Sequence, residues 1–417
     1  MAPVTVLLSR VPRVCPPSRM ASAAAAAAQA RPRLRPLRRC LSLSSSSVPS
    51  PPPDRPIRWG IVSAGLISTD YARAVASTPG HEVGVVAARC PDRAGALAGL
   101  LGVHHCPKAY GGSDAYSALL SDPSVDVVYV GTVAEHHLDV ARASLAAGKP
   151  TVVEKPLTVG LAGTVELAAA ARRDGIFLME GLWTRCFPAM AAVGELLRSG
   201  AIGRCAVVQA DFGWSTRGAV PVPGHRVWHP ESGGLVLDVG MYMAALGQVA
   251  FPGAAVERVQ AMGRTRHGVD HTVGATVLYS GDGDGDGDGD GDGGEGRPGG
   301  MLQFYVTGEG DTEERVVFQG THGRIVLDPP AHVPTSFRVL TSEGGARRED
   351  VHEFPLPADG GLSGWNYPGS AGFRYQIEEV GRCLREGRTE CPRYTLDDSV
   401  QVAAVLEEIL NQVHGRT

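Results

Sequence analysis

The sequence has no uninterrupted apolar run near the roughly 20 residues that a membrane-spanning helix requires. The Ala-rich stretch after Met20 is too short and too weakly apolar to serve as one. This absence argues against a transmembrane protein. With 417 residues, 43% of them hydrophobic and 20% charged, the chain instead has the composition of a globular protein with two domains, each burying its own core.

Acidic side chains are missing from residues 1–53, which contain eight arginines and are rich in Ala, Ser and Pro. Such a composition is typical of an organellar transit peptide, and a disordered tail is the alternative. The segment Arg39-Cys40-Leu41-Ser42 resembles a mitochondrial processing site, so we expect a mitochondrial protein, with a plastid or cytoplasmic location as alternatives. Removing this leader changes the formal charge from −5 to −5 − 8 = −13, which disfavours binding to nucleic acid.

No two of the eight cysteines form a C-x-x-C pair, which predicts reduced thiols and no structural zinc. Two histidine pairs have a spacing that could serve a metal, His225 with His229 and His267 with His271. However, Pro230 and the surrounding Gly and Val residues argue against a helix that presents either pair on one face, and no carboxylate or thiolate set accompanies them. We therefore predict no metal site.

From Ile57 onward, short apolar runs alternate with amphipathic stretches. The pattern predicts strands at 57–62, 82–88, 126–131 and 151–153, and helices near 67–77, 93–101, 116–120 and 135–147. Strands and helices that alternate at this spacing indicate a parallel sheet with right-handed crossovers, hence a doubly wound (Rossmann) α/β domain over residues 57–180. Ligands of such sheets bind beyond the carboxyl ends of the strands.

After residue 181 the pattern changes to extended runs with few helices, which predicts an α+β domain with a large, mostly antiparallel sheet over 181–417. Helical patterns at 375–385 and 396–413 close the chain and could pack back on the first domain. The other expected elements are helices at 189–197 and 234–251 and strands at 205–212, 256–262, 272–279, 302–307, 314–319, 323–327 and 337–340.

A Gly-Asp alternation from Gly281 to Asp292, followed by more glycine to Gly300, lies between two of these strands. It cannot bury apolar surface, so we expect a disordered hairpin extension over 281–300. A calcium-binding repeat is the alternative, but such repeats need an aliphatic residue in each turn, and none is present.

The first predicted strand-to-helix turn, residues 60–68, is a candidate dinucleotide site. Backbone N–H groups at such a turn can bind a pyrophosphate. Against the pattern G-x-G-x-x-G/A, Ser63 and Ser68 replace the first and third glycines, and only Gly65 is kept. The position after the first strand favours dinucleotide binding over a plain tight turn.

The second predicted strand ends in Ala87-Ala88-Arg89, where an acidic residue would hold the ribose 2′-hydroxyl of NAD. With no acid to repel it, and with Arg89 and Arg93 to bind it, a 2′-phosphate is favoured, so we expect NADP rather than NAD. The alternative is that both arginines are solvated residues at a helix start.

Lysine is scarce, since only Lys108, Lys149 and Lys155 stand against 39 − 3 = 36 arginines. Lys155 follows the strand 151–153, at the sheet edge where the nicotinamide half of the cofactor should lie, and its compact ammonium could tune the pKa of a neighbour. Asp238 and Tyr242, four positions apart, should share one face of an otherwise apolar helix. On residue patterns alone, they are equally a buried structural pair or a site pair.

Segments dispersed along residues 57–395 resemble the glucose-fructose oxidoreductase (Gfo/Idh/MocA) superfamily, and within it the branch of dimeric dihydrodiol and NADP-dependent D-xylose dehydrogenases. The matching segments are Arg58-Trp59-Gly60-Ile61-Val62-Ser63, Gly65-Leu66-Ile67-Ser68, Tyr129-Val130-Gly131-Thr132, Ala146-Ala147-Gly148-Lys149, Glu154-Lys155-Pro156-Leu157, Phe177-Leu178-Met179-Glu180, Trp183-Thr184-Arg185, Gly233-Gly234, Asp238-Val239-Gly240-Met241-Tyr242 and Cys383-Leu384-Arg385. Their order is the same as in the family.

The resemblance implies roles for individual residues. Lys155 and Tyr242 would be the acid/base pair and Asp238 their orienting partner, with Trp183 and Arg185 lining the nicotinamide and substrate pocket. A free phenol titrates near 10, so Tyr242 could act as a base near neutral pH only if a cation such as Lys155 stabilised its tyrosinate. The expected cofactor contacts also include Ser63, Gly65, Leu66, Ile67, Arg89, Arg93, Gly131, Thr132, Glu154 and His137, the last of which could equally be a simple helix-start residue.

The implied activity is oxidation of a secondary or anomeric hydroxyl by hydride transfer to NADP⁺, with trans-dihydrobenzenediol, D-xylose or both as substrate. The resemblance also implies a homodimer. Cys186 stands where the branch has an aromatic residue, which puts the substrate in doubt, and the leader and the Gly-Asp insertion are foreign to the animal members. A dehydrogenase of another sugar or cyclitol is an alternative. A regulatory protein that binds NADP without turnover is another, although the retention of Lys155, Asp238 and Tyr242 argues against it.

Overall fold

The computed structural model describes residues 55–101, 107–218, 226–281, 299–343, 346–358 and 364–416. The leader at 1–53, most of the Gly-Asp insertion, and His225 lie outside these residues. Within the described part of the chain, no helix is both long enough and apolar enough to cross a membrane.

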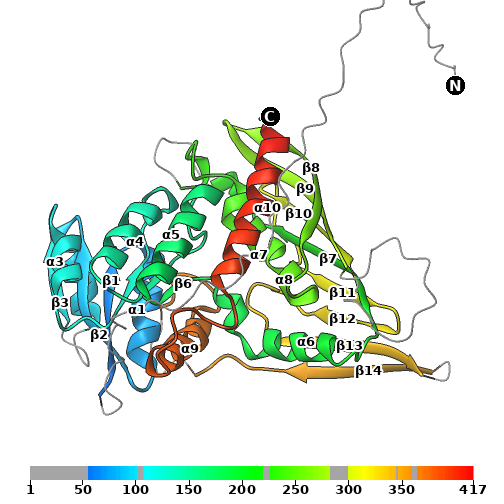
Figure 1. The fold of residues 1–417 in the computed structure, drawn as a ribbon, viewed down its shortest axis with the longest axis horizontal. Helices are drawn as coiled ribbons and strands as arrows, with labels where there is room; N and C mark the ends of the chain where they lie inside the picture. The colour runs from blue at the N-terminus through cyan, green and yellow to red at the C-terminus, as the bar shows by residue number, and fades with distance from the viewer. Residues whose placement is uncertain are drawn as a thin grey trace, which may run out of the picture. The chain divides into compact units, whose positions relative to one another are not determined.

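The first half of the described chain forms a parallel sheet of six strands in the order β3-β2-β1-β4-β5-β6 (Figure 1). This is the strand order of a doubly wound dinucleotide-binding fold, as the sequence predicts. The strands are β1 (Ile57–Val62), β2 (His81–Ala88), β3 (Lys108–Gly111), β4 (Val127–Val130), β5 (Thr151–Val153) and β6 (Leu178–Glu180). The helices between them are α1 (Leu66–Ser77), α2 (Pro91–Leu101), α3 (Ala115–Ser121), α4 (His137–Ala146) and α5 (Leu161–Asp174).

Three of these elements were not expected, namely β3, β6 and α5. The two strands are short, with four and three residues. β3 is an edge strand whose side chains are mostly exposed, and β6 lies in an apolar run at 176–179 that is too short to tell a strand from a buried helix segment. In α5, the buried face consists mainly of small residues, because Thr164, Ala168 and Ala171 accompany Leu167. Its helical period is therefore weak in the sequence.

The second half contains an eight-stranded sheet in the order β14-β13-β12-β11-β7-β10-β9-β8. All neighbouring strands pair antiparallel except β7 and β10, which are parallel, so the expected α/β fold with a second, mostly antiparallel sheet is confirmed. The strands are β7 (Cys205–Gly213), β8 (Val256–Arg266), β9 (Val269–Tyr279), β10 (Gly300–Thr307), β11 (Val316–Gly320), β12 (Gly323–Leu327), β13 (Ser336–Glu343) and β14 (Ala346–Glu353).

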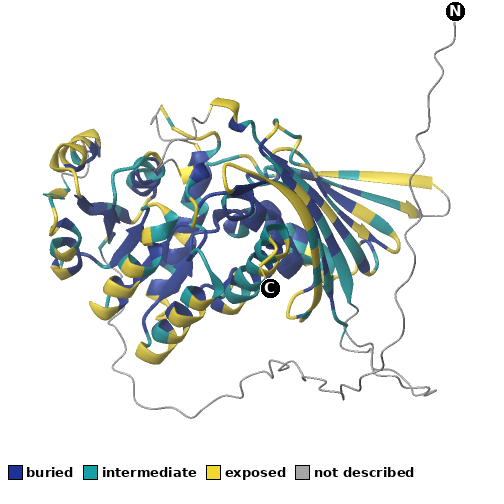
Figure 2. Cartoon of the chain, turned by 90° about the horizontal axis from the view of Figure 1, so that it is seen from above, coloured by how far each residue is buried: buried dark blue, intermediate teal, exposed yellow. Residues whose placement is uncertain are grey.

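One face of this sheet is covered and the other is open. Along β10, Leu302, Phe304 and Val306 are buried, whereas Gln303 and Tyr305 point to the opposite side. Such alternation is typical of an antiparallel sheet that packs on one face only. Figure 2 shows the contrast between the buried and exposed positions of the sheet. The remaining helices are α6 (Pro188–Arg198), α7 (Met241–Ala244), α8 (Leu246–Ala250), α9 (Phe373–Arg385) and α10 (Leu396–His414).

The segment expected as one helix over 234–251 is instead broken into three pieces. A π-helical turn, η5 (Val236–Gly240), precedes α7 and α8. Gly234 has a φ of 94°, and a Cβ there would lie 2.0 Å from Oδ1 of Asp270. The other oxygen of this carboxylate, Oδ2, accepts the N–H of Val236 at 2.7 Å. The buried Asp270 carboxylate therefore fixes the start of the segment that carries Asp238 and Tyr242. Single π turns inside helices are frequent at functional sites.

The two closing helices contact both halves of the described chain. Helix α10 packs against α5 of the first half and against β8 of the second, and α9 packs against α1. A buried carboxylate, Asp70 on α1, accepts hydrogen bonds from the backbone N–H groups of Asn366 and Tyr367 and from the hydroxyl of Ser370. The segment before α9 is thereby attached to the helix that starts the candidate nucleotide site.

Candidate active site

The turn after β1 has the geometry that a dinucleotide site needs. Ser63 adopts a φ of 87°, the left-handed conformation for which the family pattern uses glycine. Gly65 is the N-cap of α1 and has no side chain to cap the helix, so the first N–H groups of α1 stay open to an anion. The neighbouring residues Leu66, which is 60% exposed, and Ile67 form the first turn of that helix.

The third position of the pattern, Ser68, is buried against the end of β4. Its hydroxyl donates to the carbonyl of Gly131 at 3.2 Å, and a Cβ on Gly131 would lie 2.3 Å from that same hydroxyl. Glycine is therefore required at 131 for the close approach of helix and strand. Beside it, Oγ1 of Thr132 is buried and has no hydrogen-bond partner among the described residues. An unpartnered buried hydroxyl at this sheet edge fits a polar ligand such as the cofactor.

His137, at the start of α4, links the ends of β4 and β5. Its Nδ1 lies 2.7 Å from the carbonyl oxygen of Pro156 and its Nε2 lies 3.0 Å from that of Thr132. Burial lowers the pKa of this histidine, while the two carbonyl contacts oppose that shift. The ring thus connects two loops at the expected cofactor edge.

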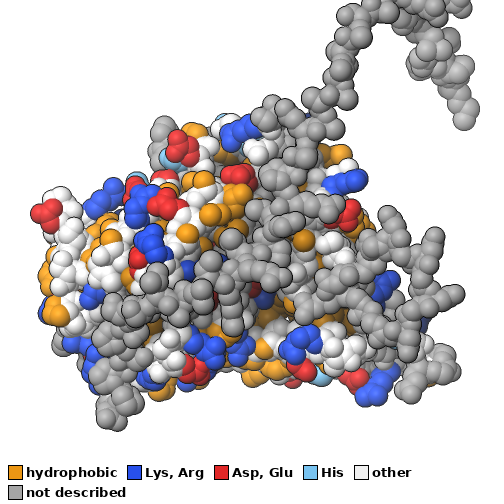
Figure 3. All heavy atoms as spheres, in the orientation of Figure 1, with side chains coloured by type: hydrophobic (Ala, Val, Ile, Leu, Met, Phe, Trp, Pro, Cys, Tyr) orange, Lys and Arg blue, Asp and Glu red, His pale blue; other side chains and the backbone are white. Residues whose placement is uncertain are grey.

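Arg93 reaches the nucleotide turn, because its Nη2 donates to the carbonyl of Ala64 at 2.6 Å. Arg89 follows β2 directly and is exposed, and its guanidinium lies beside the Tyr116 hydroxyl. The Arg93 guanidinium therefore lies at the turn after β1, and that of Arg89 lies beside α3. In Figure 3, basic and acidic side chains are interspersed over the visible face of the molecule rather than gathered by sign.

At the end of β5, Glu154 is buried and Lys155 projects toward the second half of the chain. Glu154 accepts the hydroxyl of Tyr129 at 2.8 Å and the N–H of Lys155 at 3.2 Å. Burial raises the pKa of Glu154, although Lys155 and these hydrogen bonds oppose the shift. Lys155 Nζ donates to the carbonyl oxygen of Asp238 at 2.6 Å and to its carboxylate at 3.2 Å.

The Asp238 carboxylate is shared with a second cation that the sequence analysis did not find, Arg226. This arginine forms an ion pair with Oδ1 of Asp238 and lies over the ring of Trp214, 5.7 Å from its centroid. Burial alone would raise the pKa of Asp238, but Arg226 and Lys155 together lower it to about 2. Asp238 is therefore a fixed anion at neutral pH. No local pattern marks Arg226, which lies in a short 3-10 turn after an irregular segment.

Tyr242 lies beside this cluster but bonds elsewhere. Its hydroxyl accepts Nε1 of Trp183 at 3.2 Å, and Lys155 Nζ lies 5.3 Å from the centroid of its ring. Burial and the charge of Glu154 raise the pKa of Tyr242, while the bond from Trp183 opposes that shift. The phenol is thus protonated at neutral pH. The expected stabilisation of a tyrosinate by Lys155 does not dominate here.

Three further residues that the sequence analysis missed surround Tyr242. The ring of Phe212 lies 5.9 Å from the ring of Tyr242, and His332 lies 5.7 Å from it. His332 is in turn hydrogen-bonded to Glu314. These residues come from the end of β7 and from two loops of the second sheet, so only the tertiary fold brings them together.

Arg185 and Cys186 point away from Tyr242. The Arg185 guanidinium donates to the carbonyls of Ala245 (3.1 Å) and Arg393 (2.9 Å). It therefore links the junction of α7 and α8 to the segment before α10, and makes neither of these bonds to Lys155 or Tyr242.

Cys186 belongs to a buried thiol cluster. Its thiol contacts that of Cys391, and Cys391, Cys383 and Glu379 place their donor atoms within 4.8 Å of one another. Arg382 and Arg393 both pair with the Glu379 carboxylate. A cation here would therefore compete with two guanidinium groups.

The pair His267 and His271, considered above for metal binding, packs around an indole. His271 is hydrogen-bonded to Thr216 at 3.0 Å and stacks on Trp228, and His267 lies edge-on to the same ring.

The first half of the described chain is a doubly wound domain whose first helix begins without a capping side chain. Lys155, Asp238 and Tyr242 lie at the carboxyl edge of its sheet. This combination defines an oxidoreductase that binds a dinucleotide. Residues 57–182 match the family model "Oxidoreductase family, NAD-binding Rossmann fold", and residues 190–326 match the "GFO/IDH/MocA C-terminal domain". The chain belongs to this GFO/IDH/MocA oxidoreductase family, and the expected enzyme class is confirmed at that level.

Similar proteins are spread among vertebrates. The trans-1,2-dihydrobenzene-1,2-diol dehydrogenase of Sus scrofa is 36% identical over 357 residues, which cover 85% of this chain and 96% of the relative. That of Danio rerio is 36% identical over 362 residues, covering 86% and 97%. Among solved structures, a 3-ketoreductase from Actinomadura kijaniata, in complex with NADP and TDP-benzene, has a TM-score of 0.67 at 24% identity, covering 86% of this chain and 98% of its own. A levoglucosan dehydrogenase, in complex with NADH and levoglucosan, has a TM-score of 0.69 at 18% identity, covering 87% and 98%. The two structures show the shared fold.

Proposed function

We propose that the protein is an NADP-dependent dehydrogenase that oxidises a secondary or anomeric hydroxyl of a small diol or sugar. The observation that carries this proposal is the placement of Lys155 Nζ between Asp238 and the ring of Tyr242, at the carboxyl edge of the nucleotide-binding sheet. The names of the relatives support a diol, and trans-dihydrobenzenediol and D-xylose are the two substrates to test.

In the proposed reaction, the phenol of Tyr242 exchanges a proton with the substrate oxygen while Lys155 and Trp183 orient it. Trp183 donates to the Tyr242 oxygen, which leaves the phenol O–H and one lone pair available for the substrate oxygen. Asp238 holds the ammonium of Lys155 in place. Bound NADP⁺ would supply the hydride acceptor and a positive charge, and a positive charge near the phenol would favour loss of the Tyr242 proton.

We propose NADP rather than NAD because of the charges at the end of β2. Ala88 is followed by Arg89, with Arg93 one helical turn further on, and Arg93 already donates to the nucleotide turn. A 2′-phosphate at this position would meet two guanidinium groups, which bind phosphate through charge-assisted hydrogen bonds. Residues 87–89, where an acid would hold the 2′-hydroxyl of NAD, provide no carboxylate.

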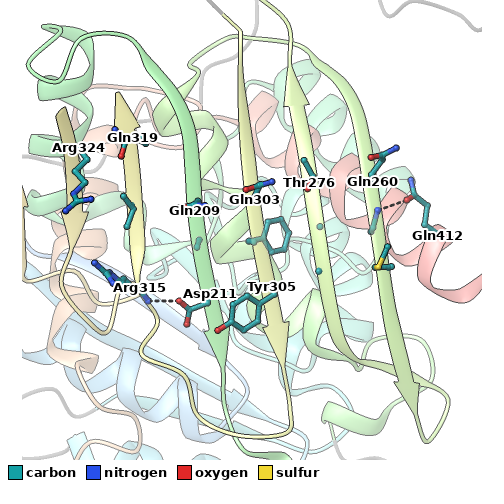
Figure 4. Close-up of a pocket in the computed structure, with 17 residues that line it drawn as sticks. Gln209, Asp211, Gln260, Thr276, Gln303, Tyr305, Arg315, Gln319, Arg324 and Gln412 are labelled. Atoms are coloured by element: carbon teal, nitrogen blue, oxygen red, sulfur yellow. Dashed lines mark hydrogen bonds between the residues drawn. The ribbon is translucent and has the colours of Figure 1, made fainter. Parts of the chain in front are cut away.

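We also propose a homodimer that pairs through the open face of the eight-stranded sheet. A hollow of about 960 Å³ lies on that face, lined by polar side chains such as Gln209, Gln303, Thr276 and Arg315 (Figure 4). It lies apart from Lys155 and Tyr242. Tyr305, which is 47% exposed, and Met262, which is 80% exposed, also line this hollow, so a partner subunit seated there would bury apolar surface of both. Light scattering of the protein and of Y305R would test this pairing.

The experiment that tests the activity uses the purified full chain. NADPH formation is measured with D-xylose and with trans-dihydrobenzenediol, alongside NADPH binding. Turnover of either substrate with NADP⁺ supports the proposal. Tight NADPH binding with no turnover on any diol or sugar would contradict it and favour a regulatory protein that binds NADP.

We also propose, from the composition of residues 1–53, that the protein is imported into mitochondria. Fusing that segment to a fluorescent protein tests this proposal.

A further inference from the structure

Two polar side chains, His332 and Glu314, form a hydrogen-bonded dyad in the wall around Tyr242. Nδ1 of His332 is bonded to Oε2 of Glu314. The His332 ring stacks on Phe212 at 4.9 Å and lies 5.7 Å from the ring of Tyr242 and 6.4 Å from that of Trp183, all between centroids. Their side chains are only 23% and 14% exposed. The dyad therefore lies beside Tyr242, which exchanges the proton in the proposed reaction, and beside Trp183, which donates to the Tyr242 oxygen.

Backbone contacts fix both members of the dyad. The carbonyl of His332 accepts the Thr184 hydroxyl at 2.6 Å, which ties it to the short 3-10 turn η2 (Trp183–Cys186). The N–H of Glu314 donates to Asp211 at 3.1 Å, and its carbonyl accepts the N–H of Ala331 at 3.1 Å. Glu314 also has a φ of 56°, a conformation that non-glycine residues keep only where the surroundings enforce it, and such residues cluster at functional sites.

Glu314 decides which nitrogen of His332 carries the proton. A carboxylate at Nδ1 selects the Nδ1–H tautomer, which leaves the lone pair of Nε2 as a hydrogen-bond acceptor. Across the described ranges, Nε2 of His332 has no recorded hydrogen-bond partner. An acceptor of this kind pairs well with a ligand hydroxyl and poorly with an apolar ring.

We propose that the His332–Glu314 dyad binds a second hydroxyl of the substrate, on a ring carbon that is not adjacent to the one whose hydroxyl Tyr242 handles. It thereby selects polyhydroxylated substrates over substrates whose remaining surface is apolar. This inference rests on the proposed function, because it assigns specificity within the same pocket. A site built to hydrogen-bond a hydroxyl rejects an analogue that lacks it, since the buried acceptor is then left unpaired. D-xylose, which has a hydroxyl on each ring carbon but one, offers such a non-adjacent hydroxyl. In trans-dihydrobenzenediol the only other hydroxyl is on the adjacent carbon, so D-xylose is favoured.

The test compares kcat/KM for these two substrates in the full-length wild type, H332F and E314Q. H332F keeps a ring to stack on Phe212 but removes the acceptor. We expect it to lower kcat/KM for D-xylose about 10- to 100-fold, mainly through KM, and to leave the value for the diol unchanged or raised. E314Q should give a smaller change in the same direction. The matched control is H352F, because His352 also stacks on a phenylalanine, Phe337, at 4.6 Å, but in the hairpin of β13 and β14.

An unchanged ratio of the two kcat/KM values in H332F would overturn the inference while the proposed function stood. If the wild type turned over neither substrate, binding would decide the inference, and the proposed function itself would fail only if no diol or sugar were turned over. Quenching of tryptophan fluorescence by D-xylose in the NADPH complex should then be weaker in H332F, and equal affinities would overturn the inference. If H332F did not fold, as judged by its Tm, the same comparison with E314Q would decide it.

Discussion

The ammonium of Lys155 donates both to the backbone carbonyl of Asp238 (2.6 Å) and to its carboxylate (3.2 Å). Lys155 ends a strand of the parallel sheet, and Asp238 lies in the π turn that leads to Tyr242. This double contact therefore fixes the lysine relative to the phenol. Arg226 and Lys155 lower the pKa of this carboxylate to about 2, so Asp238 stays an anion well below neutral pH.

Removing the ammonium of Lys155 or the carboxylate of Asp238 should reduce turnover more than it weakens cofactor binding. For K155M we expect kcat to fall by about 10²- to 10⁴-fold, the usual contribution of a positioned acid or base, and for D238N by about 10²-fold, because the lysine loses its anchor. The Kd for NADPH, followed by fluorescence, should change by less than about threefold in D238N. D139N, an exposed aspartate on α4, is the matched control. A D238N variant with wild-type kcat would show that the anchor is dispensable.

The direction of the reaction should set its pH dependence. Burial and the charge of Glu154 raise the pKa of Tyr242, so the protonated phenol persists well above neutral pH. As an acid in carbonyl reduction, Tyr242 is then active throughout, and the reductive kcat/KM should be flat from about pH 6 to about pH 9. As a base in oxidation it must lose its proton, so the oxidative kcat/KM should rise over the same range. Y242F should lose activity in both directions, and an oxidative profile that is flat in the wild type would contradict this assignment.

Arg226 should support the site through Asp238. Loss of its charge in R226M removes the larger of the two cationic influences that lower the pKa of Asp238, so that pKa should rise from about 2. We expect kcat to fall about 10-fold, with R226K recovering part of the loss because it restores the charge. The measurement is kcat in R226M, R226K and the surface control R347M. An R226M variant indistinguishable from R347M would remove Arg226 from the site.

Sequence patterns predict the nucleotide half of this molecule well because its signals are local. The turn at Gly65 and the position of Lys155 follow from strands and helices that are adjacent in the chain. Arg226, Glu314 and His332 could not be found this way, because their approach to Tyr242 depends on the insertion of β10 between β7 and β9 and on irregular loops. The sequence over 234–251 has a helical period throughout, so the π turn at Asp238 is invisible without the contact between Gly234 and Asp270.

The arginines after β2 should discriminate NADP from NAD. In R89A and in R93A we expect the KM for NADP to rise about 10- to 100-fold, the cost of losing a charge-assisted hydrogen bond to phosphate, with a larger rise in the double variant. The KM for NAD should change little. Because Arg93 also donates to Ala64 in the nucleotide turn, equal increases for both cofactors would indicate support of the turn rather than recognition of the 2′-phosphate. R142A, on the surface of α4, serves as the control.

The buried carboxyl of Glu180, on β6, should make stability depend on pH. Burial raises its pKa to about 7, against an ordinary value of 4.5, although the N–H of Leu157 donates to it at 2.8 Å. The folded state therefore binds the proton more tightly than the unfolded state, and the free energy of unfolding should fall by up to about 3 kcal/mol as pH rises from about 4.5 to about 7. In E180Q, which can still accept the Leu157 N–H, this part of the pH dependence should disappear. The measurement is urea unfolding at pH 5 and pH 8 in the wild type, E180Q and the exposed control E166Q. If E180Q lost as much stability between those pH values as the wild type does, Glu180 would have to be ionised inside the fold at both.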